Sequence, residues 1–149
     1  MEQDSRNRLI GKATELFSER GFHLVSVEQI VDASDELRGA MARHFPRKED
    51  LVHAVLEKRY DDILDSIERR QKTIPDPVGK IKGIFDWYGD WFRTPEFSGC
   101  LFERALSEFG VEAKGISDVA IRYKRTLKNQ MADVLRTLLP QVHAIRLAV

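Results

Sequence analysis

Apolar side chains recur along most of the chain at steps of three and four residues, the spacing of one face of an α-helix. The first stripe lies within residues 5–22 and consists of Leu9, Ile10, Ala13, Leu16 and Phe17. A second, short stripe follows Ser26, which forms a capping-box pattern with Gln29 at the start of a new helix. No stretch alternates apolar and polar residues as a half-buried strand would, so the pattern predicts an all-α fold.

A much longer helix is predicted to begin at Lys48. Glu49 and Asp50 follow directly, and carboxylates are favourable at the positive end of a helix. The apolar stripe continues to about Arg70, where "TIPDPVG" interrupts it with two prolines that a helix interior excludes. Three more helical patterns follow: an aromatic-rich stripe in residues 78–92, a short stripe in "CLFERALSEFG", and a long amphipathic stripe in residues 116–139 that Pro140 ends.

The 149-residue chain carries 24 Lys and Arg against 24 Asp and Glu, so its formal net charge is zero. This balance gives no overall attraction to nucleic acid or to an anionic membrane, and any DNA contact has to come from a local basic patch. The lone cysteine, Cys100, excludes an intrachain disulfide framework and favours a cytoplasmic setting. No apolar run approaches the roughly 18 residues of a membrane span, and the charged N-terminus is unlike a signal peptide.

Two segments, "ATELFSERGFHLVSVEQIV" and "RGAMARHFPRKEDLVHAVLE", together resemble the TetR family of bacterial transcription regulators over roughly the first 60 residues. The resemblance implies a three-helix helix-turn-helix DNA-binding domain in residues 1–50. A long helix would join it to a helical ligand-binding and dimerisation domain in residues 51–149. It also implies a repressor that binds operator DNA as a homodimer and is released by a small-molecule effector. No cofactor, metal or membrane partner is implied.

The residues expected to meet DNA follow from the docking geometry of such a domain. A recognition helix in the major groove needs small or polar residues on its outer face, so that the backbone can approach the bases. Arg38, Gly39, Ala40 and Arg43 fit this requirement. Phosphate contacts are expected from Ser26, His44 and Lys48.

Four positions depart from the pattern that the resemblance implies. It expects a glycine at Asp35, an apolar residue at Glu36, a helix-capping serine or threonine at Leu37 and an aromatic residue at Ala42. Leu37 cannot cap a helix. The two acids would neighbour DNA phosphates, so the affinity for DNA is expected to be weaker than is usual in the family.

Two local structures are compatible with the segment between Ser26 and His44. Its apolar residues lie at steps of three and four without interruption, which would permit one continuous helix and destroy the helix-turn-helix. Alternatively, Ser34 caps a second helix that has Asp35 and Glu36 in its first turn. The good match on both sides of the segment favours the two-helix alternative.

The second half offers weaker indications of function. Five aromatic residues are candidates for a ligand pocket, although such residues at helical spacing more often form plain core: Trp87, Trp91, Phe92, Phe102 and Tyr123. His53 and Glu57 lie one turn apart without an evident third metal ligand. No nucleophile elbow or phosphate loop appears, so the sequence does not predict an enzyme.

The resemblance also implies two further long helices after the one at residues 116–139, so the second domain is expected to be short at its C-terminal end. Two alternatives therefore stay open beside the repressor. The chain could be a degenerate relative that no longer binds DNA and keeps a ligand-binding or partner-binding helical surface. It could also be a decayed sequence without a function of its own.

Overall fold

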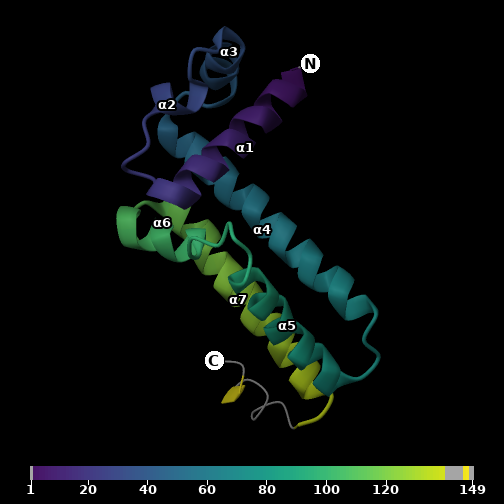
Figure 1. Cartoon of the computed structure of the whole chain (residues 1–149). Helices are drawn as coiled ribbons and strands as arrows, with labels where there is room; N and C mark the ends of the chain where they lie inside the picture. The colour runs from purple at the N-terminus through teal and green to yellow at the C-terminus, as the bar shows by residue number, and fades with distance from the viewer. Residues whose placement is uncertain (1, 140–145, 148–149) are drawn as a thin grey trace. The chain divides into compact units, whose positions relative to one another are not determined.

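A computed structural model describes residues 2–139 and 146–147. The elements named in Figure 1 are α1 (Glu2–Arg20), α2 (Val27–Val31), α3 (Asp35–His44), α4 (Lys48–Lys72), α5 (Pro77–Phe92), α6 (Leu101–Phe109) and α7 (Lys114–Arg136). No strand occurs among the described residues, which confirms the all-α prediction. The predicted helix break at Pro140 lies outside the described residues.

The chain divides into two compact units, each with its own packing. The first consists of residues 1–59 and 98–120, and the second of residues 60–97 and 121–149. Helices α4 and α7 therefore contribute their first parts to one unit and their second parts to the other. None of the described helices is both long and apolar enough to cross a membrane.

The segment after α1 forms two helices, as the two-helix alternative predicted. The Ser26 hydroxyl accepts the Gln29 backbone N–H at 3.2 Å, and the Gln29 side chain accepts the Ser26 backbone N–H at 2.8 Å, which completes a capping box. After α2 the backbone turns at Asp32, which has φ of +52° and ψ of −144°. Ser34 then caps α3 by accepting the Leu37 backbone N–H at 3.3 Å.

The position of this turn differs from the family pattern and confirms the cap that the two-helix alternative predicted at Ser34. The family pattern would have the left-handed residue at Asp35 and the cap at Leu37. The structure places them at Asp32 and Ser34, because the Ser34 side chain already satisfies a free N–H of the first turn of α3. Asp35 is an ordinary helical residue, and Leu37 is buried in the core.

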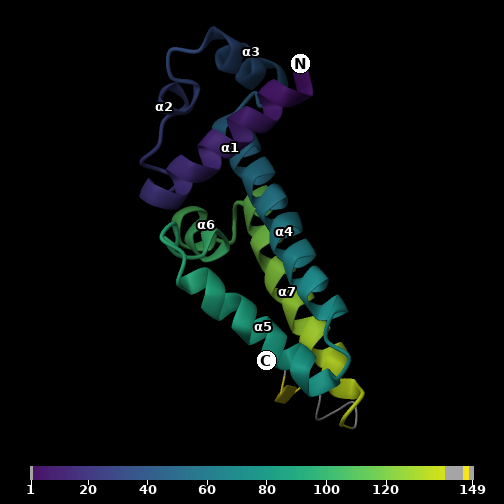
Figure 2. The same cartoon turned by 45° about the vertical axis from the view of Figure 1, so that its right-hand side comes forward.

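The core of the first unit forms around α1, whose apolar stripe meets residues of α2, α3 and the start of α4. Its fully buried members include Leu9, Ala13, Phe17, Ile30, Ala40, Leu51, Val52 and Val55. Figure 2 shows α3 lying across the N-terminal end of α1. Burial of this kind contributes about 1.5–3 kcal/mol for each large apolar side chain, which fixes α3 on α1 by its inner face.

Helix α6 belongs to the same unit and is fastened to the end of α1 by polar contacts. Arg104 donates from Nη1 to the backbone carbonyls of Phe17 and Ser18, in the last turn of α1, at 3.0 and 2.9 Å. The Glu108 carboxylate accepts the backbone N–H groups of Phe22 and His23 at 3.1 and 2.7 Å. These bonds hold the connection that leads from α1 into α2.

The second unit brings together the later part of α4, helix α5 and the later part of α7. Three side-chain contacts join these helices, and their polar atoms lie 3.0, 2.8 and 2.8 Å apart: Tyr60–Thr126, Trp87–Ser66 and Arg70–Asp90. Arg122 also lies over the ring of Tyr60, 4.5 Å from its centroid. Each pair joins residues at least 20 positions apart, so these contacts come from the tertiary structure alone.

Asp32→Gly is expected to stabilise the protein by about 1 kcal/mol. A residue with a β-carbon is strained at this φ and ψ by about 1–3 kcal/mol, and glycine relieves that strain. The greater conformational freedom of glycine in the unfolded chain cancels part of the resulting stabilisation. Thermal and urea unfolding would measure the difference. Asp32→Ala is the control, because it keeps the β-carbon and loses only the exposed ion pair with Lys12. A glycine variant no more stable than the alanine variant would contradict the prediction.

Candidate nucleic-acid interface

Helix α3 has one inward and one outward face. Leu37, Ala40 and Met41 are buried, whereas Arg38 and Ala42, one helical turn apart, are exposed. The outward position expected for Ala40 is therefore wrong, since its spacing of three from Leu37 turns it towards the core. The exposed face keeps the small and basic residues that a helix needs in the major groove.

The two arginines of α3 each lie near a carboxylate. Arg38, whose side chain is 64% exposed, is 3.4 Å from Asp35 one turn earlier on the same helix. Arg43 Nε is 3.8 Å from Glu2 Oε1 at the start of α1. Exposed pairs of this kind contribute about 0–1 kcal/mol, so DNA phosphates can displace the carboxylates at little cost.

Gly39 leaves space for the side chain of Arg43. A β-carbon at Gly39 would lie only 3.1 Å from Arg43 Nη1, so a larger residue would push the guanidinium away from the helix. Gly39 is itself half-buried on the helix surface. Its small size therefore allows Arg43 to lie along α3.

Glu36 points towards α1, away from the exposed face of α3. Its carboxylate accepts hydrogen bonds from the Ser5 hydroxyl and from Arg8 Nη1, the latter at 2.8 Å, while the side chain stays 49% exposed. The hydrogen bond from Ser5, together with the bond and charge of Arg8, holds the pKa of Glu36 below its ordinary value of 4.5. The charge is neither buried unpaired nor aimed at DNA, unlike the expectation from the sequence.

The three residues expected to contact phosphate differ in access. Ser26 is exposed, and its hydroxyl hydrogen is not used by the capping bond that its oxygen accepts. Lys48 is half-buried at the first position of α4. His44 has only 21% of its side chain exposed, and its Nε2 lies 3.8 Å from Glu2. Ser26 and Lys48 are thus better placed than His44 for an anion.

A surface groove lies beside the exposed face of α3. It is lined by Val27, Glu28, Val31, Arg38, Met41, Ala42, Phe45, Pro46 and Lys48. Its floor is mainly apolar, and two of the predicted DNA-binding residues, Arg38 and Lys48, contribute to the same groove. The sequence-based argument named these two cations but did not predict the apolar surface between them, because the groove forms only when α2, α3 and α4 pack together.

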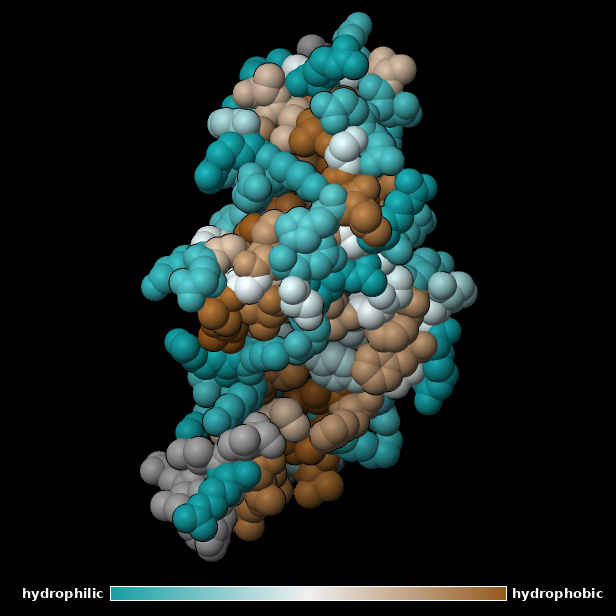
Figure 3. All heavy atoms as spheres, turned by 90° about the vertical axis from the view of Figure 1, so that its left-hand side faces the viewer, coloured by the Kyte–Doolittle hydropathy of each residue, from teal (hydrophilic) through white to brown (hydrophobic). Residues whose placement is uncertain are grey.

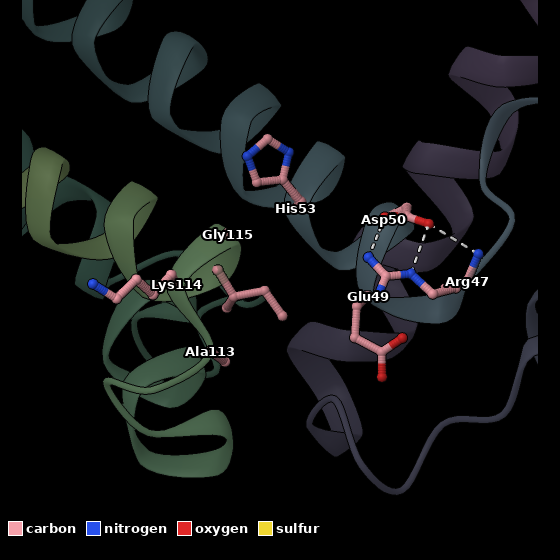
Figure 4. Close-up of a pocket in the computed structure, with 8 residues that line it drawn as sticks. Arg47, Glu49, Asp50, His53, Ala113, Lys114 and Gly115 are labelled. Carbon is pink, nitrogen blue, oxygen red and sulfur yellow. Dashed lines mark hydrogen bonds and ion pairs between the residues drawn. The ribbon is translucent and has the colours of Figure 1, made fainter.

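A second pocket of the first unit lies between the start of α4 and the start of α7 (Figure 4). On the α4 side, Arg47 forms a reciprocal pair with Asp50, which accepts both its backbone N–H and its guanidinium at 3.0 Å. Hydrogen bonding from Arg47 lowers the pKa of Asp50. His53 on α4 and Lys114 on α7 also line the pocket. None of the five aromatic residues predicted to bind a ligand lines it.

Those five aromatic residues fall into different units. Trp87, Trp91, Phe92 and Tyr123 belong to the second unit, whereas Phe102 belongs to the first and is buried in its core. The rings of Trp87 and Trp91 lie 5.7 Å apart. The hydroxyl of Tyr123 is hydrogen-bonded to that of Tyr88, and Phe92 is 55% exposed. Their role in ligand binding stays a prediction.

Hydrophobic surface is also exposed away from the groove. Figure 3 shows it on one face of the molecule, in separate places between hydrophilic side chains. The most exposed large apolar residues among those described are Leu24, Val111, Val78, Leu147 and Phe85. His53 and Glu57 lie 3.4 Å apart, but the described residues contain no group of three or more His, Cys, Asp or Glu that could hold a metal ion.

Comparison with known proteins finds a family model that matches part of the chain. Residues 9–55 match the model of "Bacterial regulatory proteins, tetR family". The chain is 29% identical over 115 residues, 76% of its length, to the HTH-type transcriptional repressor DhaR of Mycobacterium sp. (strain GP1), of which it covers 54%. It is 24% identical over 90 residues, 60% of its length, to the HTH-type transcriptional activator FasR of Mycolicibacterium smegmatis, of which it covers 41%.

A solved structure extends the likeness beyond the N-terminal helices. SCO4454, a TetR-family transcriptional regulator from Streptomyces coelicolor, superimposes with a TM-score of 0.84 at 25% identity, over 90% of this chain and 71% of that one. The chain spans about half the length of the curated relatives it matches. The matched family consists of transcription regulators rather than enzymes.

Glu36→Gln is expected to lower the free energy of unfolding at neutral pH and to make that free energy less dependent on pH in the acid range. Because the pKa of Glu36 is depressed in the folded state, its contribution is present above the ordinary value of 4.5 and is lost as the pH falls through the folded-state value. Urea unfolding at about pH 7 and about pH 3 would show the difference between variant and wild type shrinking in acid. Glu15→Gln, at an exposed position of α1, is the control. An equal loss of stability at both pH values would contradict the predicted coupling between the ionisation of Glu36 and folding.

Proposed function

The chain is a TetR-family transcriptional regulator, and on that premise we propose that it represses transcription by binding operator DNA through α2 and α3. A second copy of the chain supplies the other half-site contact, and a small molecule bound by the helical second domain releases the DNA. The single observation that carries the proposal is the exposed face of α3. On this face the Arg38 side chain is exposed and lines a groove that Lys48 also lines.

The chemistry of this face suits DNA at two levels. An exposed arginine on a recognition helix can donate two hydrogen bonds to the O6 and N7 atoms of guanine. Lys48 lies at the start of the long helix α4, whose positive dipole end favours phosphate, and the Ser26 hydroxyl can donate a hydrogen bond to a phosphate. Buried Leu37 and Met41 hold the opposite face of α3 on the core, so the donors are presented from a fixed helix.

The direction of regulation follows the longer of the two curated matches. DhaR is a repressor and shares 115 aligned residues with the chain, whereas FasR is an activator and shares 90. Repression requires only that the bound protein occupies the promoter. In a reporter strain carrying the selected DNA sequence at its promoter, expression of the chain is therefore expected to lower transcription, and a rise would identify an activator instead.

The alternative is a relative that no longer binds DNA and keeps a surface for a partner protein. Its support is electrostatic: Asp35 and Glu2 lie beside the two arginines of α3, and the chain has no net positive charge. Repulsion between these acids and DNA phosphates would then outweigh the attraction of the arginines. The experiment below separates this alternative from the repressor.

Selection from a pool of random duplexes at low salt is expected to enrich a palindromic sequence, whose Kd then follows from fluorescence anisotropy. Arg38→Ala should weaken binding to it by about 5- to 150-fold, the effect of losing one bidentate base contact of about 1–3 kcal/mol. Raising the salt should weaken binding steeply, because phosphate contacts release counterions.

Arg69→Ala is the matched control, since Arg69 is exposed on the second part of α4. It should leave the Kd unchanged. Absence of any enriched sequence would overturn the repressor and favour the partner-binding alternative. Equal losses in the two variants would show that Arg38 contributes only charge.

A further inference from the structure

We propose that Ala42 and the apolar groove beside it bind the C5-methyl group of a thymine, within about two base pairs of the base that Arg38 contacts. This inference rests on the proposed function and deepens it, because it states which base α3 selects in addition to a guanine. Ala42 is exposed on α3, and its side chain is a single methyl group that can neither donate nor accept a hydrogen bond.

The chemistry of the groove restricts what can occupy it. Val27, Val31, Met41 and Phe45 give it an apolar floor next to Ala42. Among the groups that base pairs present in the major groove, the thymine methyl is the large apolar one, whereas cytosine has only a hydrogen at the same C5 position and the other groups are hydrogen-bond donors and acceptors. Burial of a donor or acceptor against this floor would leave it without a partner, which is unfavourable.

The charges around the groove indicate how DNA lies on it. Arg38 and Lys48 line the groove together with the apolar floor, and both attract the polyanion. Glu28 lines the same groove, and its carboxylate repels a phosphate placed directly over the floor. The backbone of the DNA is therefore favoured at the two cations, and the base edges are favoured over Val27, Val31 and Ala42.

The helix geometry sets the position of the thymine relative to the base contacted by Arg38. Ala42 follows Arg38 by four residues, a rise of about 6 Å along the helix. Successive bases are about 3.4 Å apart along each strand, so the two side chains meet positions separated by about two base pairs. A larger side chain at position 42 would cover the groove, whereas alanine leaves it open.

The test removes single methyl groups from the DNA and leaves the protein unchanged. In the selected duplex, each thymine of a half-site is replaced in turn by uracil, and Kd is measured by anisotropy with the wild-type chain. The guanine that Arg38 contacts is the one whose replacement makes the wild type and Arg38→Ala bind equally. At one thymine position within two base pairs of this guanine, uracil is expected to weaken binding about fourfold. This factor corresponds to burial of one methyl-sized group. The other positions should be unaffected.

A variant of the protein identifies the residue that reads the methyl. Ala42→Gly should reduce the fourfold preference for the thymine duplex over the uracil duplex, because only the apolar floor then contacts the methyl, while Ala54→Gly should keep the full preference. Ala54 lies in α4 outside the groove, so both variants carry the same type of change within a helix. Equal binding of both duplexes by the wild-type chain, or an undiminished preference in Ala42→Gly, would overturn the inference. The proposed function would survive that result, whereas failure to enrich any duplex would overturn both.

Discussion

The turn between α2 and α3 is the constraint on which the rest of the first unit depends. The apolar positions from Val27 to Phe45 would fit a single helix, and a single helix would carry Arg38 away from any recognition geometry. Asp32 prevents this with a backbone conformation that residues other than glycine rarely adopt, and Ser34 restarts the helix by capping it. Strain at one residue is thus offset by the capping bond and by the burial of Leu37, Ala40 and Met41 on α1.

Once α3 is held in this way, its charges are divided between two faces. Glu36 bonds to Ser5 and Arg8 of α1 and helps to fix the helix, whereas Asp35 stays on the exposed side beside Arg38. The acids of α3 therefore have unequal consequences: one supports the fold, and the other competes with DNA for an arginine. A chain with zero net charge depends on such local arrangements for any contact with a polyanion.

Helix α6 packs in the same unit, although the family resemblance assigns its residues to the ligand-binding domain. Arg104 donates to backbone carbonyls of α1 and of Ser98, and the Glu108 carboxylate accepts backbone N–H groups of the connection after α1, so both residues fix the path of the chain through backbone groups. The ring of Phe109 packs on Phe22 at 5.6 Å and adds an apolar contact beside these bonds. A long-range set of this kind fixes where α2 begins in relation to α1.

The sequence by itself determined the helices and their order, because helical periodicity, caps and prolines are local signals: Ser26, Gln29 and Pro75 act within a few residues. It also predicted Arg38, Arg43, His44 and Lys48 as the basic groups near the recognition helix. The tertiary structure decided the rest. It placed the left-handed residue of the turn at Asp32, buried Ala40, directed Glu36 to α1 and formed the apolar groove beside Ala42. These outcomes depend on contacts between residues far apart in the chain, such as the 31 positions between Ser5 and Glu36, which no local pattern encodes.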